Sequence, residues 1–107
     1  MIRRARNVRD FDGGFIAPRH GYGGVESYYA DNSALSYACG IAVPTLCIAA
    51  SDDPCVPVST YEPFRRAATR GVRMTVTQGG GHVGFHDIAG TVPWHDRAIA
   101  HFFERLA

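Results

Sequence analysis

Two segments of the chain carry the hydrophobic pattern of β-strands. Residues 45–50 are nearly all apolar, as is typical of a strand that is buried on both faces. Residues 72–77 alternate between apolar and polar positions, and Gly79–Gly81 end that run. Between the two strands, the pattern predicts a helix through residues 64–69 that Ser59 or Thr60 caps.

The remaining apolar positions predict helices. Near the C-terminus, bulky apolar residues recur at helical spacing and predict an amphipathic helix over residues 93–106. The first part of the chain predicts a short helix over 4–12, an irregular stretch over 13–24, a helical turn over 25–30 and a helix over 33–39. We therefore divide the chain into a helical, cap-side segment, residues 1–43, and a strand-helix-strand-helix segment, residues 44–107.

The order of these elements defines the fold class. Two strands joined by a helix imply a right-handed crossover and parallel pairing, so the chain is predicted to be α/β. A parallel sheet buries both faces and needs several strands, and the segment 45–50 is too apolar for an edge that faces water. The sequence thus predicts an incomplete sheet. Its missing strands are expected in residues absent from this chain, in a partner or in a second copy.

Length and charge narrow the possible functions. At 107 residues the chain is at most one domain, and 46% of its residues are hydrophobic, as expected for a folded protein. A net charge of +1 gives no electrostatic reason to expect nucleic acid or an anionic membrane as a partner. The sequence has no apolar run of transmembrane length and no secretory signal, so we expect a cytoplasmic protein without a transmembrane segment.

The candidate chemistry lies just after the two strands. Functional groups in open parallel sheets gather beyond the carboxyl ends of strands, and Asp53 lies there, in the turn after residue 50. His82 follows the second strand on a loop with three glycines before it and Gly84 after it. A carboxylate can hold a histidine in the tautomer needed for general-base catalysis, so Asp53 and His82 are the candidate catalytic residues. For the neighbouring Asp52 we favour an ordinary turn role.

A nucleophile is not visible. Serine hydrolases of the α/β class carry the serine in a Gly-x-Ser-x-Gly turn, and none of the five serines here has glycine at both of the required positions. The order in that class is Ser, Asp, His, which would place the serine upstream of Met1. The three cysteines are not flanked by the sharp glycine-bounded turn that a nucleophile needs.

A metal site is the weakest interpretation. His82 and His86 stand four residues apart, but that spacing brings two ligands together only on a helix, and the surrounding glycines argue against one. Cys39, Cys47 and Cys55 form no CxxC pair, and Cys47 lies within an apolar strand, where a small buried thiol is usual. We therefore expect no metal site.

Several motifs resemble the C-terminal part of the YheT-like, ABHD-type α/β-hydrolases. They are RDFD at 9–12, HGY at 20–22, YY at 28–29 with Ser33, PTL at 44–46 with DDP at 52–54, and GGHVGF at 80–85. The resemblance implies a carboxylic-ester hydrolase without cofactors, in which Asp53 is the acid and His82 the base of a Ser-His-Asp triad. The nucleophile turn and the oxyanion-hole loop have no counterpart in this chain.

The sequence leaves two functional hypotheses. In the first, the chain is part of a serine esterase, supplies the acid and the base, and is inactive alone. In the second, it is a non-catalytic interaction module that keeps a hydrolase-like half-fold and covers its open sheet edge with a partner. The first requires the side chains of Asp53 and His82 to lie within hydrogen-bonding reach at one edge of a shared sheet.

Overall fold

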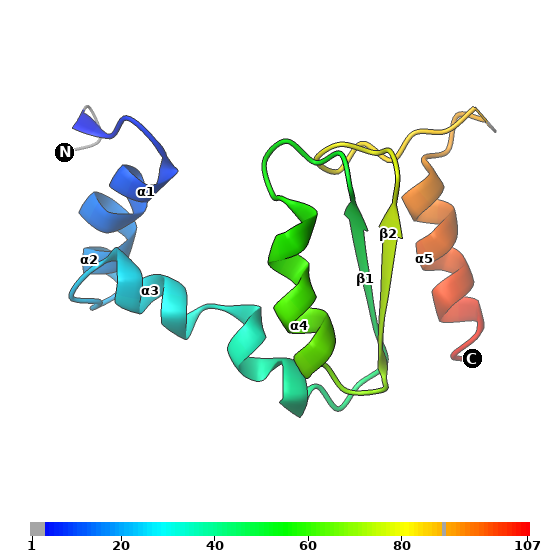
Figure 1. Ribbon diagram of the computed structural model, residues 1–107, viewed down its shortest axis with the longest axis horizontal. Coiled ribbons are helices and arrows are strands. Elements are labelled where there is room, and N and C mark those ends of the chain that lie inside the picture. The colour runs from blue at the N-terminus through cyan, green and yellow to red at the C-terminus, as the bar shows by residue number, and fades with distance from the viewer. Residues whose placement is uncertain (1–3, 89) are drawn as a thin grey trace. The chain divides into compact units, whose positions relative to one another are not determined.

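The computed structural model describes residues 4–88 and 90–107 (Figure 1). The chain forms two compact units, one that ends at Tyr37 and one that begins at Ala38. This boundary lies six residues before the predicted division at residues 43 and 44. The assignment of both segments to a single hydrolase domain stays a prediction. No helix in the described part of the chain is both long and apolar enough to cross a lipid bilayer.

The first unit is more helical than the sequence indicated. Helix α1, Val8–Phe11, continues through a π-helical turn, η2, Asp12–Ile16, into helix α2, Ala17–Arg19. The irregular stretch expected to begin at residue 13 is therefore helical as far as residue 19. Pro18 lies in the first turn of α2, where its missing N–H costs little. Gly13 and Gly14 are poor helix formers but lie within the π-helical turn, and Ala17, which follows that turn, is fully buried. Helix α3, Val25–Asp31, occupies the predicted helical turn.

The helix expected over residues 33–39 is a 3₁₀ helix, η3, Ala34–Gly40. Its tighter winding begins where the amide of Ser36 donates to the carbonyl of Ser33, three residues earlier, at 3.1 Å.

The second unit is built on a two-stranded parallel sheet. Strand β1, Thr45–Ala50, pairs with strand β2, Val72–Thr77, with Thr45 opposite Val72 and Ala50 opposite Thr77. The predicted bounds and parallel pairing of both strands are confirmed. Because the strands are parallel and in register, the loops that follow Ala50 and Thr77 leave the sheet at the same edge.

The crossover between the strands is helical, as expected. A 3₁₀ turn, η4, Val58–Tyr61, leads into helix α4, Glu62–Ala67, so the helix that was predicted to run from a cap at Ser59 or Thr60 through residues 64–69 ends two residues early. Ser59 and Thr60 lie inside the 3₁₀ turn, and no side chain caps α4, so the predicted cap is wrong. Pro63, in the first turn of α4, favours a start at this position because its fixed φ already suits a helix.

Helix α5, Trp94–Glu104, is the predicted C-terminal amphipathic helix and contacts β1. In Figure 1 the two strands lie between α4 and α5. The described residues bury little apolar surface for an α/β protein. The buried residues are four alanines and one phenylalanine, whereas large apolar side chains such as Val76, Ile99 and Phe103 are exposed. The observed architecture is a partial α/β fold whose apolar surfaces are largely uncovered.

Candidate acid–base site

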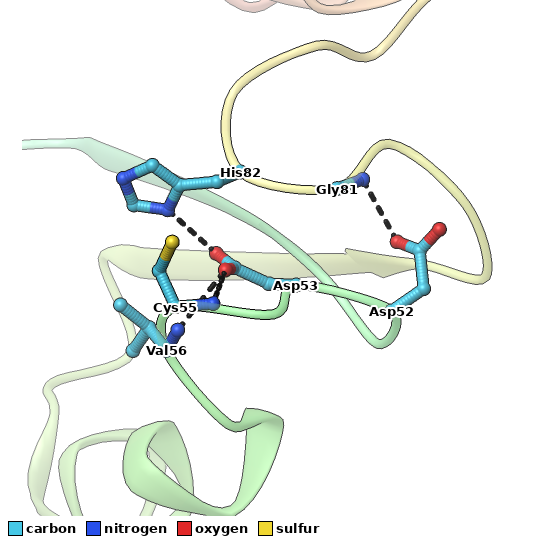
Figure 2. A network of polar contacts seen from close by, with 6 residues as sticks. All are labelled: Asp52, Asp53, Cys55, Val56, Gly81 and His82. Carbon is cyan, nitrogen blue, oxygen red and sulfur yellow. Dashed lines mark hydrogen bonds and ion pairs between the residues drawn. The ribbon is translucent and has the colours of Figure 1, made fainter.

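Asp53 is fixed by its own turn. Its Oδ1 accepts hydrogen bonds from the backbone amides of Cys55 at 2.7 Å and Val56 at 3.0 Å (Figure 2). Aspartate stabilises turns in this way by accepting from amides two or three residues further along the chain. The side chain of Asp53 is only 8% exposed. The turn therefore holds Oδ1 in place and leaves Oδ2 to make a contact elsewhere.

That contact is with His82. The Nδ1 atom of His82 lies 2.9 Å from Oδ2 of Asp53, although the two residues are 29 positions apart in the sequence (Figure 2). An ionised carboxylate can only accept, so Nδ1 carries the hydrogen, and Nε2 of the neutral ring is left as an acceptor. The His82 side chain is 51% exposed. The predicted proximity of Asp53 and His82 is confirmed, while their catalytic role stays a prediction.

The charge state of Asp53 follows from the same contacts. The hydrogen bond from His82 is the main cause that lowers the pKa of the Asp53 carboxyl below its ordinary value. The amides of Val56 and Cys55 lower this pKa further, against the opposing effect of burial. Asp53 is therefore ionised at neutral pH and can orient the imidazole and stabilise its protonated form.

The loop that carries His82 depends on glycine at particular positions. Gly80 has φ +145°, and a Cβ built on it would lie 2.6 Å from Cδ1 of Phe85, which is buried. A Cβ on Gly84 would lie 2.8 Å from the carbonyl oxygen of Gly80, which accepts the Gly84 amide at 2.9 Å. Val83 has φ +74°, in the left-handed region that residues other than glycine seldom adopt. The glycines therefore permit a tight turn that presents the His82 side chain.

Asp52 has a function in the structure that sequence reasoning missed. Its Oδ1 accepts the backbone amide of Gly81 at 2.8 Å, which links the turn after β1 to the loop after β2 (Figure 2). The two neighbouring aspartates thus bind neighbouring residues of the histidine loop, Asp52 through a backbone amide and Asp53 through the imidazole. The signal in the sequence is a pair of acids opposite a glycine-rich loop, and the predicted turn role of Asp52 covers only part of its function.

Cys55 is the other group that sequence analysis did not place here. Asp53, Cys55 and His82 each offer one possible metal-ligand atom, and these three atoms lie within 4.8 Å of one another. Among the described residues, this is the one group of three or more His, Cys, Asp or Glu side chains that could hold a metal ion. His86, the expected partner in the metal hypothesis, is not a member. The thiols of Cys39, Cys47 and Cys55 are free. Burial in the strand raises the pKa of the half-buried Cys47.

The serines of this part of the chain do not complete a triad. Ser51, directly after β1, donates its hydroxyl to the carbonyl of Gln78 at 3.0 Å, which ties the ends of the two strands together. Within residues 4–88 and 90–107, the imidazole of His82 is hydrogen-bonded to Asp53 and to no serine. The geometry accordingly contains an acid and a base, held in the relation that general-base catalysis needs.

The two-stranded parallel sheet with its helices is consistent with a partial α/β fold, and comparisons with known proteins identify the class as the α/β-hydrolases. The chain is 37% identical over 92 residues to the putative esterase YheT of Escherichia coli, an alignment that covers 86% of this chain and 26% of the relative. It is 32% identical over 108 residues to the embryogenesis-associated protein EMB8 of Picea glauca, with 98% and 24% covered. It is 31% identical over 85 residues to the phospholipase ABHD3 of Mus musculus, with 79% and 21% covered.

The chain belongs to the ABHD-type α/β-hydrolases and corresponds to their C-terminal part, as the motifs indicated. It spans about a quarter of the length of the curated relatives it matches. No family model matches the sequence. No solved structure matches it either.

Proposed function

We propose that this chain supplies the acid and the general base of a serine carboxylic-ester hydrolase, with Asp53 as the acid and His82 as the base. The observation that carries the proposal is the 2.9 Å contact between Oδ2 of Asp53 and Nδ1 of His82. This contact leaves Nε2 unprotonated on a half-exposed ring, which is the arrangement needed to take a proton from an attacking hydroxyl.

In the proposed reaction, Nε2 of His82 removes the proton of a serine hydroxyl as the oxygen attacks the acyl carbon of an ester. The imidazolium that forms is stabilised by the ionised Asp53, and it returns the proton to the departing alkoxide. Water then attacks the acyl-enzyme by the same route in reverse. Asp52 has a positioning role, because its bond to the amide of Gly81 holds the loop that presents the imidazole.

The serine and the amides that bind the oxyanion are proposed to lie outside this chain. None of the five serines stands in a Gly-x-Ser-x-Gly turn, and the chain covers about a quarter of its relatives' length. We expect the chain to be inactive alone for this reason. The substrate class, a small carboxylic ester, is proposed from relatives that are named a putative esterase, a phospholipase and a monoacylglycerol lipase.

The uncovered sheet supports the same conclusion. A two-stranded parallel sheet with its apolar faces in water is expected to be only marginally stable. Leu46 and Ile48 of β1 line an open apolar groove together with Ile99 and Phe102 of α5. We propose that further strands and helices of one α/β-hydrolase domain cover these residues, whether they come from a longer polypeptide, a separate subunit or a second copy. A cytoplasmic location stays a prediction.

A chimera tests the function directly. The segment of YheT that this chain matches is replaced by residues 1–107, and hydrolysis of a p-nitrophenyl ester is measured beside the chain alone. We expect turnover by the chimera and none by the chain. Asp53→Asn should lower kcat about 10⁴-fold because it favours the wrong imidazole tautomer. His82→Ala should cost about 10⁶-fold, as loss of a triad base does elsewhere.

His86→Ala is the matched control, since it removes a histidine of the same loop that is not part of the cluster around Asp53. The control should keep the activity of the chimera. Clear turnover by the His82→Ala chimera would show that the assignment of the base is wrong. So would an equal loss of activity in the His86→Ala control.

A non-catalytic role is the second candidate, because a separate partner protein would cover the exposed apolar groove equally well. In this case the chain is an interaction module whose sheet is covered by a partner protein, and the acid–base pair serves only to join two loops. Size-exclusion chromatography with light scattering distinguishes the interaction module from the part of a hydrolase. A monomer that unfolds cooperatively would favour an autonomous module. Aggregation that is relieved by the complementary part of a relative would favour the hydrolase.

A further inference from the structure

We propose that Asp53, Cys55 and His82 form a binding site for a borderline-soft divalent metal ion such as Zn²⁺. They offer a carboxylate oxygen, a thiol sulfur and an imidazole nitrogen, and one such atom from each lies within 4.8 Å of the others. In Figure 2 the sulfur of Cys55 lies beside the Asp53 carboxylate and the His82 ring. Zn²⁺ takes ligands of these three kinds, usually in tetrahedral geometry.

The three ligand atoms lie close enough to hold such an ion after shifts of up to roughly 1.5 Å. Bonds of about 2.0–2.3 Å in a tetrahedral site place the ligand atoms roughly 3.3–3.8 Å from one another. The Asp53–His82 contact, at 2.9 Å, would open by less than an ångström as the metal replaces the shared hydrogen. The His82 side chain is half exposed and Cys55 is exposed, so both can move and an ion can reach them from solvent. A water molecule would complete the coordination.

The surrounding structure orients the ligands. Oδ1 of Asp53 is held by two amides, one of which belongs to Cys55, so the turn that fixes the carboxylate also fixes the backbone that carries the thiol. Hydrogen bonds of this kind to ligand groups raise metal affinity elsewhere. A carboxylate and a thiolate also place two negative charges beside a dication.

The site depends on the fold, because its ligands are far apart in the sequence. Asp53 and Cys55 follow β1, whereas His82 follows β2, 29 residues after Asp53. Parallel pairing of the strands is what brings the two loops together. A metal bound here should therefore be lost when the chain unfolds, unlike one that is held by a single flexible segment.

Metal binding and general-base chemistry would compete for one imidazole. A metal on Nδ1 leaves the hydrogen of the neutral ring on Nε2, which then cannot accept a proton from a hydroxyl. If the proposed esterase function holds, Zn²⁺ should inhibit it at this site. The metal site itself does not rest on that function, and its test needs no ester substrate.

The test is a titration of the full chain with Co²⁺, which reports a thiolate ligand through a sulfur-to-cobalt charge-transfer band. We expect one Co²⁺ per chain and a band that disappears on addition of Zn²⁺. Cys55→Ser should abolish the band, whereas Cys39→Ser, which removes another exposed thiol, should keep it. His82→Ala removes a ligand and should weaken Zn²⁺ binding at least about tenfold, because even the loss of a residue that only contacts a ligand weakens metal binding by that much. Competition with a chromophoric chelator measures this affinity.

Three results would overturn the site. The first is a charge-transfer band that survives in Cys55→Ser. The second is Zn²⁺ affinity that is unchanged by both His82→Ala and Asp53→Asn. The third is binding of equal strength in concentrated urea, where the two loops are separated. Circular dichroism of each variant distinguishes loss of a ligand from loss of the fold, and an inactive chimera would leave all of these measurements valid.

Discussion

Adding one methyl group at Gly80 should break the histidine loop. The new Cβ would lie 2.6 Å from Cδ1 and 2.9 Å from Cε1 of Phe85, far inside ordinary contact distance. Alanine at φ +145° is also strained, at about 1–3 kcal/mol, and forcing a buried ring aside costs about 1–3 kcal/mol more. The total of roughly 2–6 kcal/mol is comparable with the stability of a small domain. We expect Gly80→Ala to displace Phe85 and the loop with it.

Trp94 is the assay for this displacement. It is the single tryptophan of the chain, its amide donates to the carbonyl of Phe85 at 2.8 Å, and the two rings are neighbours. Tryptophan fluorescence in urea should therefore show earlier unfolding of Gly80→Ala. Gly79→Ala is the matched control, because its Cβ would meet only a carboxylate oxygen at 3.9 Å, and its stability should stay within about 1 kcal/mol. Equal urea midpoints for the two variants would refute the argument.

Three further predictions concern the carboxylates. His82→Ala should raise the pKa of Asp53, because the hydrogen bond from His82 is the largest of the effects that lower this pKa. Carbon NMR of the Asp53 carboxyl should show the rise, and an unchanged titration would argue against the pairing. Because the pKa of Asp53 is lower in the folded than in the unfolded chain, ionised Asp53 should stabilise the fold fully above about pH 4. This stabilisation should be lost as the pH falls through the pKa of the folded state, and urea midpoints that do not depend on pH would contradict this. Asp52→Asn should speed exchange of the Gly81 amide hydrogen about tenfold, since a bond to a charged acceptor is weakened, and an unchanged rate would count against the link between the loops.

The sheet and the location of the acid–base pair could be predicted because both follow from local patterns. Residues 45–50 and 72–77 are apolar or alternating runs between turn residues, and their bounds agree with β1 and β2. Once two strands are parallel, groups just beyond their carboxyl ends have to be near one another. The proximity of Asp53 and His82 therefore followed from topology, without knowledge of any side-chain contact.

Other features could not be predicted because their causes lie far away in the sequence. The helix continues through Gly13 and Gly14 although both are poor helix formers, and the burial of Ala17 that goes with it does not show in the sequence pattern. Asp52 accepts a hydrogen bond from a backbone amide, and every non-proline residue has such an amide. The sequence therefore does not indicate which residue Asp52 will contact. Cys55 comes within 4.8 Å of His82 through the pairing of the two strands and not through any local sequence pattern.

The geometry of the acid–base pair is set locally, by the two loops that carry its side chains and by the pairing of the two strands. Among the described residues, the hydrogen bonds made by Asp52 and Asp53 join them only to residues between Ala50 and His82. Hydrogen bonds to buried or ionised groups contribute more to stability than exposed ones. Asp52 and Asp53 make five such bonds here, and a carboxylate accepts four of them. The acid and the base can therefore be in position although the sheet is incomplete, whereas a nucleophile delivered from elsewhere would depend on how the uncovered faces of that sheet are filled.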